Sequence, residues 1–291
     1  MTATSGPDQA GHRLAGQTVV ISGASRGIGA DMARLFAAEG AYVLCAARTM
    51  HQGDHKLAGS LETTVGLIRE AGGVAAAVAA DLSRPEDREA IVAAAHKEFG
   101  PIDVLVNNAL LVYRYPVHEY PLQRWMRSWE VNFQAPFHLS QLALADMIPR
   151  RSGRILNISS GAAAGPGRGP YPGAEELRLD MTCYGAEKAA LERFTQGLAQ
   201  EVYQYGIAVN ALSPTQIVAT DGVLLQGFAR SHEEERLEPL ELMSKASLLL
   251  VTEPLDAVTG RVAYSQQILH EFGWLDRAPH PRERVSGFSL I

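Results

Sequence analysis

Short apolar runs rich in Val and Ile alternate with amphipathic stretches from Thr18 onward, and this alternation constrains the fold more than any other feature of the sequence. Such runs predict buried strands, and the stretches between them have the apolar spacing of helices. Successive strand, helix and strand form right-handed βαβ units, which build a mostly parallel sheet. The strands are expected at Thr18–Ser22, Ala41–Ala46, Val74–Ala79, Val104–Asn107, Arg154–Ser159 and Ile207–Leu212.

The length of the chain suits one large domain. A compact fold of 291 residues hides roughly 75% of its unfolded surface, so a sizeable core is available. No internal repeat and no break in composition marks a second domain. We therefore expect residues 15–291 to form a single α/β domain, a doubly wound parallel sheet of about seven strands with helices on both faces. Residues 1–14 are expected to be a flexible N-terminal tail.

Three stretches interrupt the regular rhythm. His51–Ser60 lengthens the connection after the second strand, and Gly165–Asp180 is crowded with Gly and Pro, which predicts a long loop. Asp221–Pro239 contains the charged run Glu233–Arg236 and is expected to form a mobile helical excursion. The interruptions adjoin the motifs described below, which favours a role as lid loops.

Charge and cysteine content exclude several classes of function. The chain carries 32 acidic and 26 basic residues, a net charge of −6, so it has no general attraction for nucleic acid or anionic lipid. Its two cysteines, Cys45 and Cys183, do not suit a disulfide scaffold or a zinc site and favour a reducing compartment. His51 and His55 have no evident third metal ligand, so we expect no metal.

No segment suggests export or membrane insertion. The N-terminus lacks a basic start followed by an apolar stretch, and no run approaches the roughly 18 apolar residues that a spanning helix needs. A soluble cytoplasmic protein is expected.

A glycine-rich turn follows the first strand. It reads Ser22-Gly23-Ala24-Ser25-Arg26-Gly27-Ile28-Gly29 and leads into the helical sequence Ala30–Ala38. Glycines allow the backbone to turn sharply and approach a pyrophosphate, whose charge is met by amides at the helix start. The spacing Gly-x-x-x-Gly-x-Gly differs from the commoner Gly-x-Gly-x-x-Gly, and an ordinary strand-to-helix turn is the alternative. Its place at the first βα junction favours dinucleotide binding.

The end of the second strand bears on the choice of cofactor. An acidic residue there would bind the adenosine ribose and repel a 2′-phosphate, but the sequence is Cys45-Ala46-Ala47-Arg48. Arg48 and Arg26 could flank a 2′-phosphate. NADP(H) is therefore favoured over NAD(H), which stays possible.

Tyr184 and Lys188 are four residues apart in the helical stretch that continues through Ala189–Glu201. This spacing puts the phenol and the ammonium on one helical face. A cation about 4 Å away, at an effective dielectric constant near 20, would lower the phenol pKa from about 10 towards about 7. The pair then suits proton transfer at neutral pH. The Tyr-x-x-x-Lys motif alone occurs often by chance, so the other residues of the site must show whether it is catalytic.

Those other residues are present. The strand Arg154–Ser159 brings Ser159 and Ser160 to its carboxyl end, where ligands bind to open parallel sheets. Asn107-Asn108-Ala109 ends another strand. On these motifs the sequence resembles the short-chain dehydrogenase/reductase family, over about Gln17 to Trp274. The resemblance implies a Rossmann fold.

The resemblance also implies roles for individual residues. Tyr184 would be the general acid and base, and Lys188 would bind the nicotinamide ribose and lower the Tyr184 pKa. Ser160, preferred over Ser159, would hydrogen-bond the substrate oxygen, and Asn132 would hold a water of the proton relay. The cofactor-binding residues that it implies are Gly23, Ser25, Arg26, Gly27, Ile28 and Gly29 at the pyrophosphate, Asp81 and Leu82 at the adenine, Asn108 on the adenosine side and Ile217 beside the nicotinamide.

The sequence departs from the family pattern in two places. The Asn-Asn-Ala-Gly pattern ends here in Leu110, which puts a bulky side chain near the cleft. The usual Pro-Gly after the sixth strand is Pro214-Thr215, which stiffens a turn over the nicotinamide. The stretch Ala46–Gly59 and the ending around Ile268–Gly273 look like the hydroxysteroid dehydrogenase-like branch.

The expected function is the interconversion of a secondary alcohol and a ketone. A hydrophobic cyclic, terpenoid or steroid-like substrate is expected, because Leu110, Leu111, Val112, Tyr113, Tyr171 and Leu224 could line an apolar pocket. The alternatives are a non-catalytic dinucleotide-sensing regulator and a 3-oxoacyl reductase. Members of the family associate through two long helices, here about 122–147 and 184–205, so a homotetramer or homodimer is expected.

Overall fold

The computed structural model describes residues 12–166, 169–171 and 180–280. Its central element is a parallel sheet of seven strands: β1 (Thr18–Ser22), β2 (Tyr42–Ala47), β3 (Val74–Ala79), β4 (Val104–Asn107), β5 (Gly153–Ile158), β6 (Ile207–Ser213) and β9 (Val262–Tyr264). The strand order is β3-β2-β1-β4-β5-β6-β9. The order reverses between β1 and β4, which confirms the doubly wound fold and places a crevice at the carboxyl ends of these strands.

The six strands expected from the sequence are present, each end within one residue of its expected position. Complete burial explains why the pattern was readable: every residue of β1, β4 and β6 is buried, as in sheets covered on both faces. The seventh strand, β9, has three residues, too few for a recognisable apolar run.

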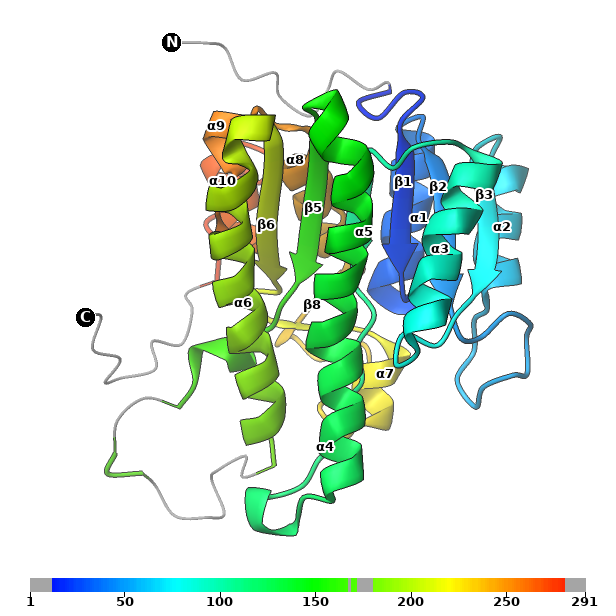
Figure 1. The fold of residues 1–291 in the computed structure, drawn as a ribbon. Coiled ribbons are helices and arrows are strands. Elements are labelled where there is room, and N and C mark those ends of the chain that lie inside the picture. Colours follow the sequence, from blue (N-terminus) through cyan, green and yellow to red (C-terminus); the bar gives the residue numbers. More distant parts are fainter. Residues whose placement is uncertain (1–11, 167–168, 172–179, 281–291) are drawn as a thin grey trace.

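Helices cover both faces of the sheet (Figure 1). They are α1 (Gly27–Ala38), α2 (Leu61–Glu70), α3 (Pro85–Glu98), α4 (Leu122–Trp129), α5 (Ala135–Arg150), α6 (Thr182–Val202), α7 (Asp221–Leu225), α8 (Leu240–Thr252), α9 (Leu255–Val258) and α10 (Ser265–Glu271). One core cluster packs α1, α2, α8 and α10 on the sheet through residues such as Phe36 and Met243. The other packs α3, α5 and α6 through Ile91, Leu139 and Leu198.

The long helix expected over residues 122–147 is interrupted. A π-helical turn, Glu130–Gln134, joins α4 to α5 and contains Asn132. The second expected helix, 184–205, is α6 followed by the single 3₁₀ turn Tyr203–Tyr205. An apolar groove between α5 and α6 exposes Phe137, and self-association through these helices stays a prediction.

The three interruptions differ from one another. Residues 51–60 form bends and turns without helix or strand. Residues 167–168 and 172–179 of the second lie outside the described residues. The third stretch, Asp221–Pro239, was expected to be a helical excursion, but its only helix is the short α7. The charged run Glu233–Arg236 forms turns. It is followed by β8 (Leu237–Glu238), which pairs with β7 (Ile217–Val218). Figure 1 shows α7 at the end of the sheet toward which β1 and β5 point.

The packed body begins earlier than expected. Leu14 is fully buried in the core, and its amide donates to the carbonyl of Glu39, so a tail cannot extend through residue 14. Residues 1–11 lie outside the described residues. Within the described part of the chain, no helix is both long and apolar enough to cross a membrane.

Candidate active site

The phosphate-binding turn has the close packing that its glycines predict. Gly23 has a left-handed φ of 72°, and its amide donates to the carbonyl oxygen of Ala46 at 2.7 Å. A Cβ on Gly23 would lie 2.8 Å from the Ala109 Cα. A Cβ on Gly29 would overlap the Gly23 carbonyl oxygen. Only glycine fits at these two positions, and the turn therefore brings bare backbone to the start of α1, as a pyrophosphate requires.

Asn108 braces this turn. Its side-chain Nδ2 donates to the Ser22 carbonyl oxygen at 2.9 Å, and its backbone amide donates to Ser22 Oγ at 3.0 Å. The residue lines the cleft, as do Ser25, Gly27 and Ile28. The side chain therefore holds the glycine-rich turn in place, and the expected position of Asn108 on the adenosine side stays a prediction.

The two arginines near the second strand have different surroundings. Arg26 is committed to the 51–60 loop: its Nε donates to the Ala58 carbonyl at 2.9 Å and an NH2 hydrogen to the Gly59 carbonyl at 2.8 Å. Arg48 is exposed and lines the cleft. Burial lowers the pKa of Arg26, and the charge of Arg48 lowers it further, which places two cations together at the end of β2.

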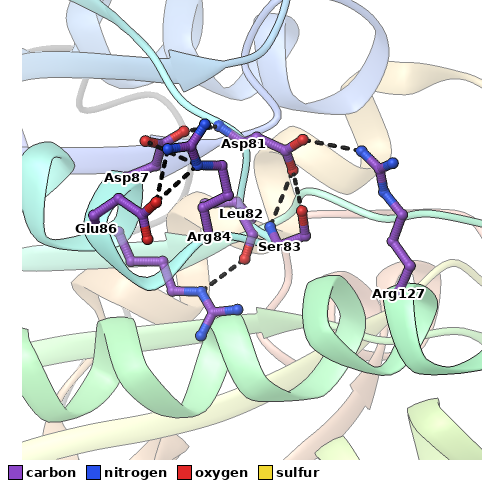
Figure 2. A network of polar contacts seen from close by, with 8 residues as sticks. Asp81, Leu82, Ser83, Arg84, Glu86, Asp87 and Arg127 are labelled. Atoms are coloured by element: carbon purple, nitrogen blue, oxygen red, sulfur yellow. Dashed lines mark hydrogen bonds and ion pairs between the residues drawn. The ribbon is translucent and has the colours of Figure 1, made fainter. Parts of the chain in front are cut away.

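Asp81 and Leu82 follow β3 and line the same cleft. Figure 2 shows Asp81 between α3 and α4: its amide donates to Asp87 at 2.7 Å, and its carboxylate accepts from Ser83 Oγ at 2.8 Å and from Arg127 at 3.0 Å. Burial raises the pKa of Asp81, but the Ser83 hydrogen bonds and the charges of Arg127 and Arg48 outweigh it and lower that pKa. These contacts fix Asp81 at the cleft, and its expected place at the adenine stays a prediction.

Tyr184, Ser160 and Lys188 meet at the carboxyl end of β5. Ser160 follows the strand, and its hydroxyl is hydrogen-bonded to the Tyr184 phenol. Lys188 is buried, and its Nζ donates to the Ile158 carbonyl at 2.7 Å and lies 5.8 Å from the centre of the Tyr184 ring. Tyr184 and Ser160 line the cleft. Three of the four expected catalytic residues are therefore adjacent.

The expected lowering of the Tyr184 pKa is wrong for the protein without cofactor. Burial raises the pKa of Tyr184 to about 12, against the opposing hydrogen bond from Ser160. Burial also lowers the pKa of Lys188 to about 8, although the charges of Glu187 and Glu192 oppose the decrease. The argument from spacing omitted desolvation, which is the largest cause of the pKa shift at both groups.

Asn132 lies behind these residues. Its Oδ1 accepts from the Leu111 amide at 2.8 Å, and its Nδ2 donates to the Leu111 carbonyl at 2.7 Å and to Glu187 at 2.5 Å. Both hydrogens of its amide are therefore bonded within the protein. The side chain fixes the segment after β4, and a relay water at Asn132 would have to bind another of its atoms.

A cleft of about 2810 Å³ runs from the phosphate turn past Tyr184. Its size exceeds that of an ordinary ligand pocket, about 300–1,000 Å³, and suits a dinucleotide together with a substrate. Its lining includes the apolar residues Leu110, Leu111, Val112, Met181, Val223, Leu225 and Phe228, together with the polar residues Asp221, Gln226, His232 and Arg236. Tyr113, Tyr171 and Leu224, which the sequence also suggested, do not line it.

The turn expected beside the nicotinamide is tied to α10. Thr215 Oγ1 donates to Gln267 Oε1 at 2.7 Å and accepts from the Gln266 amide at 3.0 Å. Ile217, two residues on, lines the cleft. Thr215 therefore supplies hydrogen bonds that a glycine could not, as its departure from the family pattern suggested.

No motif in the sequence indicates the part played by Arg114. Its Nε donates to Asp180 at 2.7 Å, its NH1 donates to the Gln226 carbonyl at 2.6 Å, and its guanidinium lies 5.0 Å from the centre of the Phe228 ring. Arg114 thereby joins the loop after β4 to the segments before α6 and after α7. These partners are up to 112 residues away in sequence, so no local pattern could reveal them.

Comparison with known proteins gives a consistent result. The sequence model of the short chain dehydrogenase family matches residues 17–223. The chain is 37% identical over 202 residues to 3beta-hydroxysteroid dehydrogenase 1 of Eggerthella lenta, covering 69% of this chain and 70% of that protein. It is 28% identical over 260 residues to 5-keto-D-gluconate 5-reductase of Escherichia coli, covering 86% and 94%.

A solved structure agrees. The crystal structure of a short chain dehydrogenase from Burkholderia cenocepacia in complex with NADP has a TM-score of 0.68 to this chain at 26% identity. The match covers 87% of this chain and 97% of that one.

Proposed function

This chain belongs to the short-chain dehydrogenase family, and from that premise we propose that it interconverts a secondary alcohol and a ketone with Tyr184 as the proton donor and acceptor. Like the family, it is an NAD(P)-dependent oxidoreductase that acts on CH–OH groups. The observation that supports the residue assignment is that Tyr184 and Ser160 line the same cleft as the glycine-rich turn, with the buried Lys188 ammonium 5.8 Å from the centre of the Tyr184 ring.

The turn fits a dinucleotide because Gly23 and Gly29 line the cleft and let the backbone pack tightly there, where a Cβ on either residue would collide with neighbouring atoms of the protein. The bound nicotinamide would supply or accept the hydride. Ser160 would donate a hydrogen bond to the substrate oxygen and so stabilise negative charge there. Tyr184 would transfer the proton to or from that oxygen, and Lys188 would position the nicotinamide ribose.

The raised pKa of Tyr184 suits the reducing direction. With a pKa of about 12, the phenol keeps its proton at neutral pH and is ready to donate it to a developing alkoxide. Oxidation needs the phenolate, so it requires additional positive charge near the phenol, such as the oxidised nicotinamide ring carries.

We propose that NADP(H) is the preferred cofactor. Ala47 leaves the acidic position at the end of β2 vacant, and Arg48 is exposed at the cleft beside Arg26. The pKa of His55 also reflects the positive charge in this region. Burial lowers that pKa, and the charges of Arg26 and Arg48 lower it further. This positive region suits a 2′-phosphate.

Replacing Arg48 tests the cofactor preference. Arg48→Ala is expected to lower kcat/KM for NADPH by about 10- to 100-fold, because a hydrogen bond to a charged group contributes about 1.5–3 kcal/mol. The value for NADH should change little, since NADH has no 2′-phosphate. Lys97→Ala on the exposed part of α3 is the matched control. An equal loss with both cofactors would contradict the assignment.

The apolar residues of the cleft lining, among them Leu110, Leu111 and Phe228, support a hydrophobic cyclic, terpenoid or steroid-like substrate. A panel of steroid ketones, cyclic terpenoid ketones, keto-sugar acids and 3-oxoacyl thioesters, assayed by NADPH absorbance, tests this proposal. The cyclic apolar ketones should give the highest kcat/KM. Turnover restricted to keto-sugar acids or thioesters would overturn the substrate class but retain the reaction.

The panel also tests the second candidate, a dinucleotide-sensing regulator. Tight NADPH binding without consumption on any carbonyl compound would favour the regulator. The retained Tyr184, Ser160 and Lys188 favour the enzyme, because a sensor requires the phosphate turn and no proton-transfer group.

A further inference from the structure

A second acidic group lies inside the catalytic region, and the roles proposed above do not use it. Glu187 is one turn after Tyr184 on α6 and directly precedes Lys188, and only 1% of its surface is exposed. Its Oε1 accepts from Ser128 Oγ of α4 at 2.5 Å, and its Oε2 accepts from Asn132 Nδ2 at 2.5 Å. The carboxylate therefore links α6 to two neighbouring elements.

The hydrogen bond to Asn132 reaches the substrate end of the cleft. Asn132 holds both backbone polar groups of Leu111, and Leu111 lines the cleft. Glu187, Asn132 and Leu111 thus form a continuous chain of hydrogen bonds from α6 to the segment after β4. Because Asn132 and Glu187 are buried, loss of one would leave a hydrogen-bonding group of the other unsatisfied.

The charge of Glu187 matters to Lys188. A buried ammonium is unstable without a nearby negative charge, and the described groups that supply one are Glu187 and Glu192, which accepts from Ser159 Oγ at 2.6 Å. The other titratable groups that face Glu187 are Tyr184 and Cys183 on α6 and Tyr120 on the loop before α4.

We propose that Glu187 is a positioning residue of the active site, whose carboxylate holds Asn132 in place and supplies negative charge that stabilises the buried Lys188 ammonium. The catalytic importance of Glu187 rests on the proposed function. The effect of Glu187 on the Lys188 ammonium does not, because the ammonium can be observed without substrate. A purely structural role would require the two hydrogen bonds but not the charge.

Glu187→Gln separates the hydrogen bonds from the charge. The amide has nearly the same shape: its oxygen can accept from Asn132, and its NH₂ can donate to Ser128 Oγ, which keeps its own bond to the Trp125 carbonyl. Only the negative charge is lost. Glu187→Asp keeps the charge on a shorter side chain, and Glu201→Gln, exposed further along α6, is the matched control.

Lysine-selective NMR makes the measurement practicable. The chain has only four lysines, Lys56, Lys97, Lys188 and Lys245, and Lys188 is the one with a pKa lowered to about 8. We expect Glu187→Gln to lower the Lys188 pKa by about one unit or more, and Glu187→Asp and Glu201→Gln to leave it nearly unchanged. An unchanged Lys188 pKa in folded Glu187→Gln would overturn the proposal.

A double variant covers the case in which Glu187→Gln does not fold. A buried charge without a nearby opposite charge is strongly destabilising, whereas removing both charges is often neutral. Glu187→Gln combined with Lys188→Met should then recover a cooperative thermal transition. Failure of the double variant to fold would refute charge compensation.

Activity assays distinguish a failure of the Glu187 inference from a failure of the proposed function. In an active enzyme, Glu187→Gln should move the alkaline side of the kcat profile to lower pH, because Lys188 loses its proton sooner. Absence of turnover in the wild type would count against the proposed reaction and would leave the NMR result for Lys188 standing.

Discussion

Tyr184→Phe is expected to lower turnover by about 10²- to 10⁴-fold, the usual contribution of a positioned proton donor. The phenol is the titratable group that the structure places in hydrogen-bond contact with Ser160 at the cleft. Phe retains the buried ring and its packing, so affinity for NADPH should change little. Initial rates of NADPH oxidation and a fluorescence titration of NADPH measure the two quantities.

Tyr203→Phe is the control for this variant. Tyr203 is 50% exposed just after the end of α6, so loss of its hydroxyl should not alter turnover. Wild-type turnover in Tyr184→Phe would show that another group transfers the proton.

Gly29→Ala should have the largest effect on cofactor binding. The added Cβ would overlap the Gly23 carbonyl oxygen and lie 2.5 Å from Asn108 Nδ2, so the turn would have to move. Overpacking of this kind costs about 1–3 kcal/mol, which is roughly 10- to 100-fold in affinity if the displaced turn must be restored on binding. The dissociation constant of NADPH, measured by calorimetry, should rise accordingly.

Gly66→Ala in α2 provides a matched substitution. No atom lies within 4 Å of a Cβ at Gly66, and Ala is favoured over Gly in a helix by about 0.5–1 kcal/mol, so NADPH affinity should be unchanged and stability slightly higher. Equal NADPH affinity in Gly29→Ala and the wild type would contradict the placement of the pyrophosphate at this turn.

The sheet was predictable because its strands are buried on both faces. Continuous apolar runs such as Val104–Asn107 can be recognised without knowledge of their partners. The π-helical turn at Asn132 was not predictable, since its hydrogen bonds to Leu111 and Glu187 depend on elements distant in sequence. The same applies to β9, whose three residues gain their stability from pairing with β6.

The site was predictable in composition but less so in its electrostatics. The motifs brought Tyr184, Ser160 and Lys188 together because Ser160 lies just after β5 and the other two lie in the first two turns of α6. The spacing of Tyr184 and Lys188 could not reveal that burial dominates both pKa values or that Lys188 donates to Ile158. Nor could it identify Glu187 or Arg114, whose roles depend on the packing of α4 and the loops around the cleft.

Titration of the Tyr184 phenol, with and without NADP⁺, tests most directly the claim that this group moves the proton. The difference in ultraviolet absorbance between the wild type and Tyr184→Phe isolates the phenolate. Without cofactor, its pKa should lie near 12. With NADP⁺ bound, the added positive charge should lower it by roughly three units, the effect of a cation about 4 Å away at an effective dielectric constant near 20. The same high pKa in the complex would contradict the proposed role of Tyr184 as the proton acceptor in alcohol oxidation.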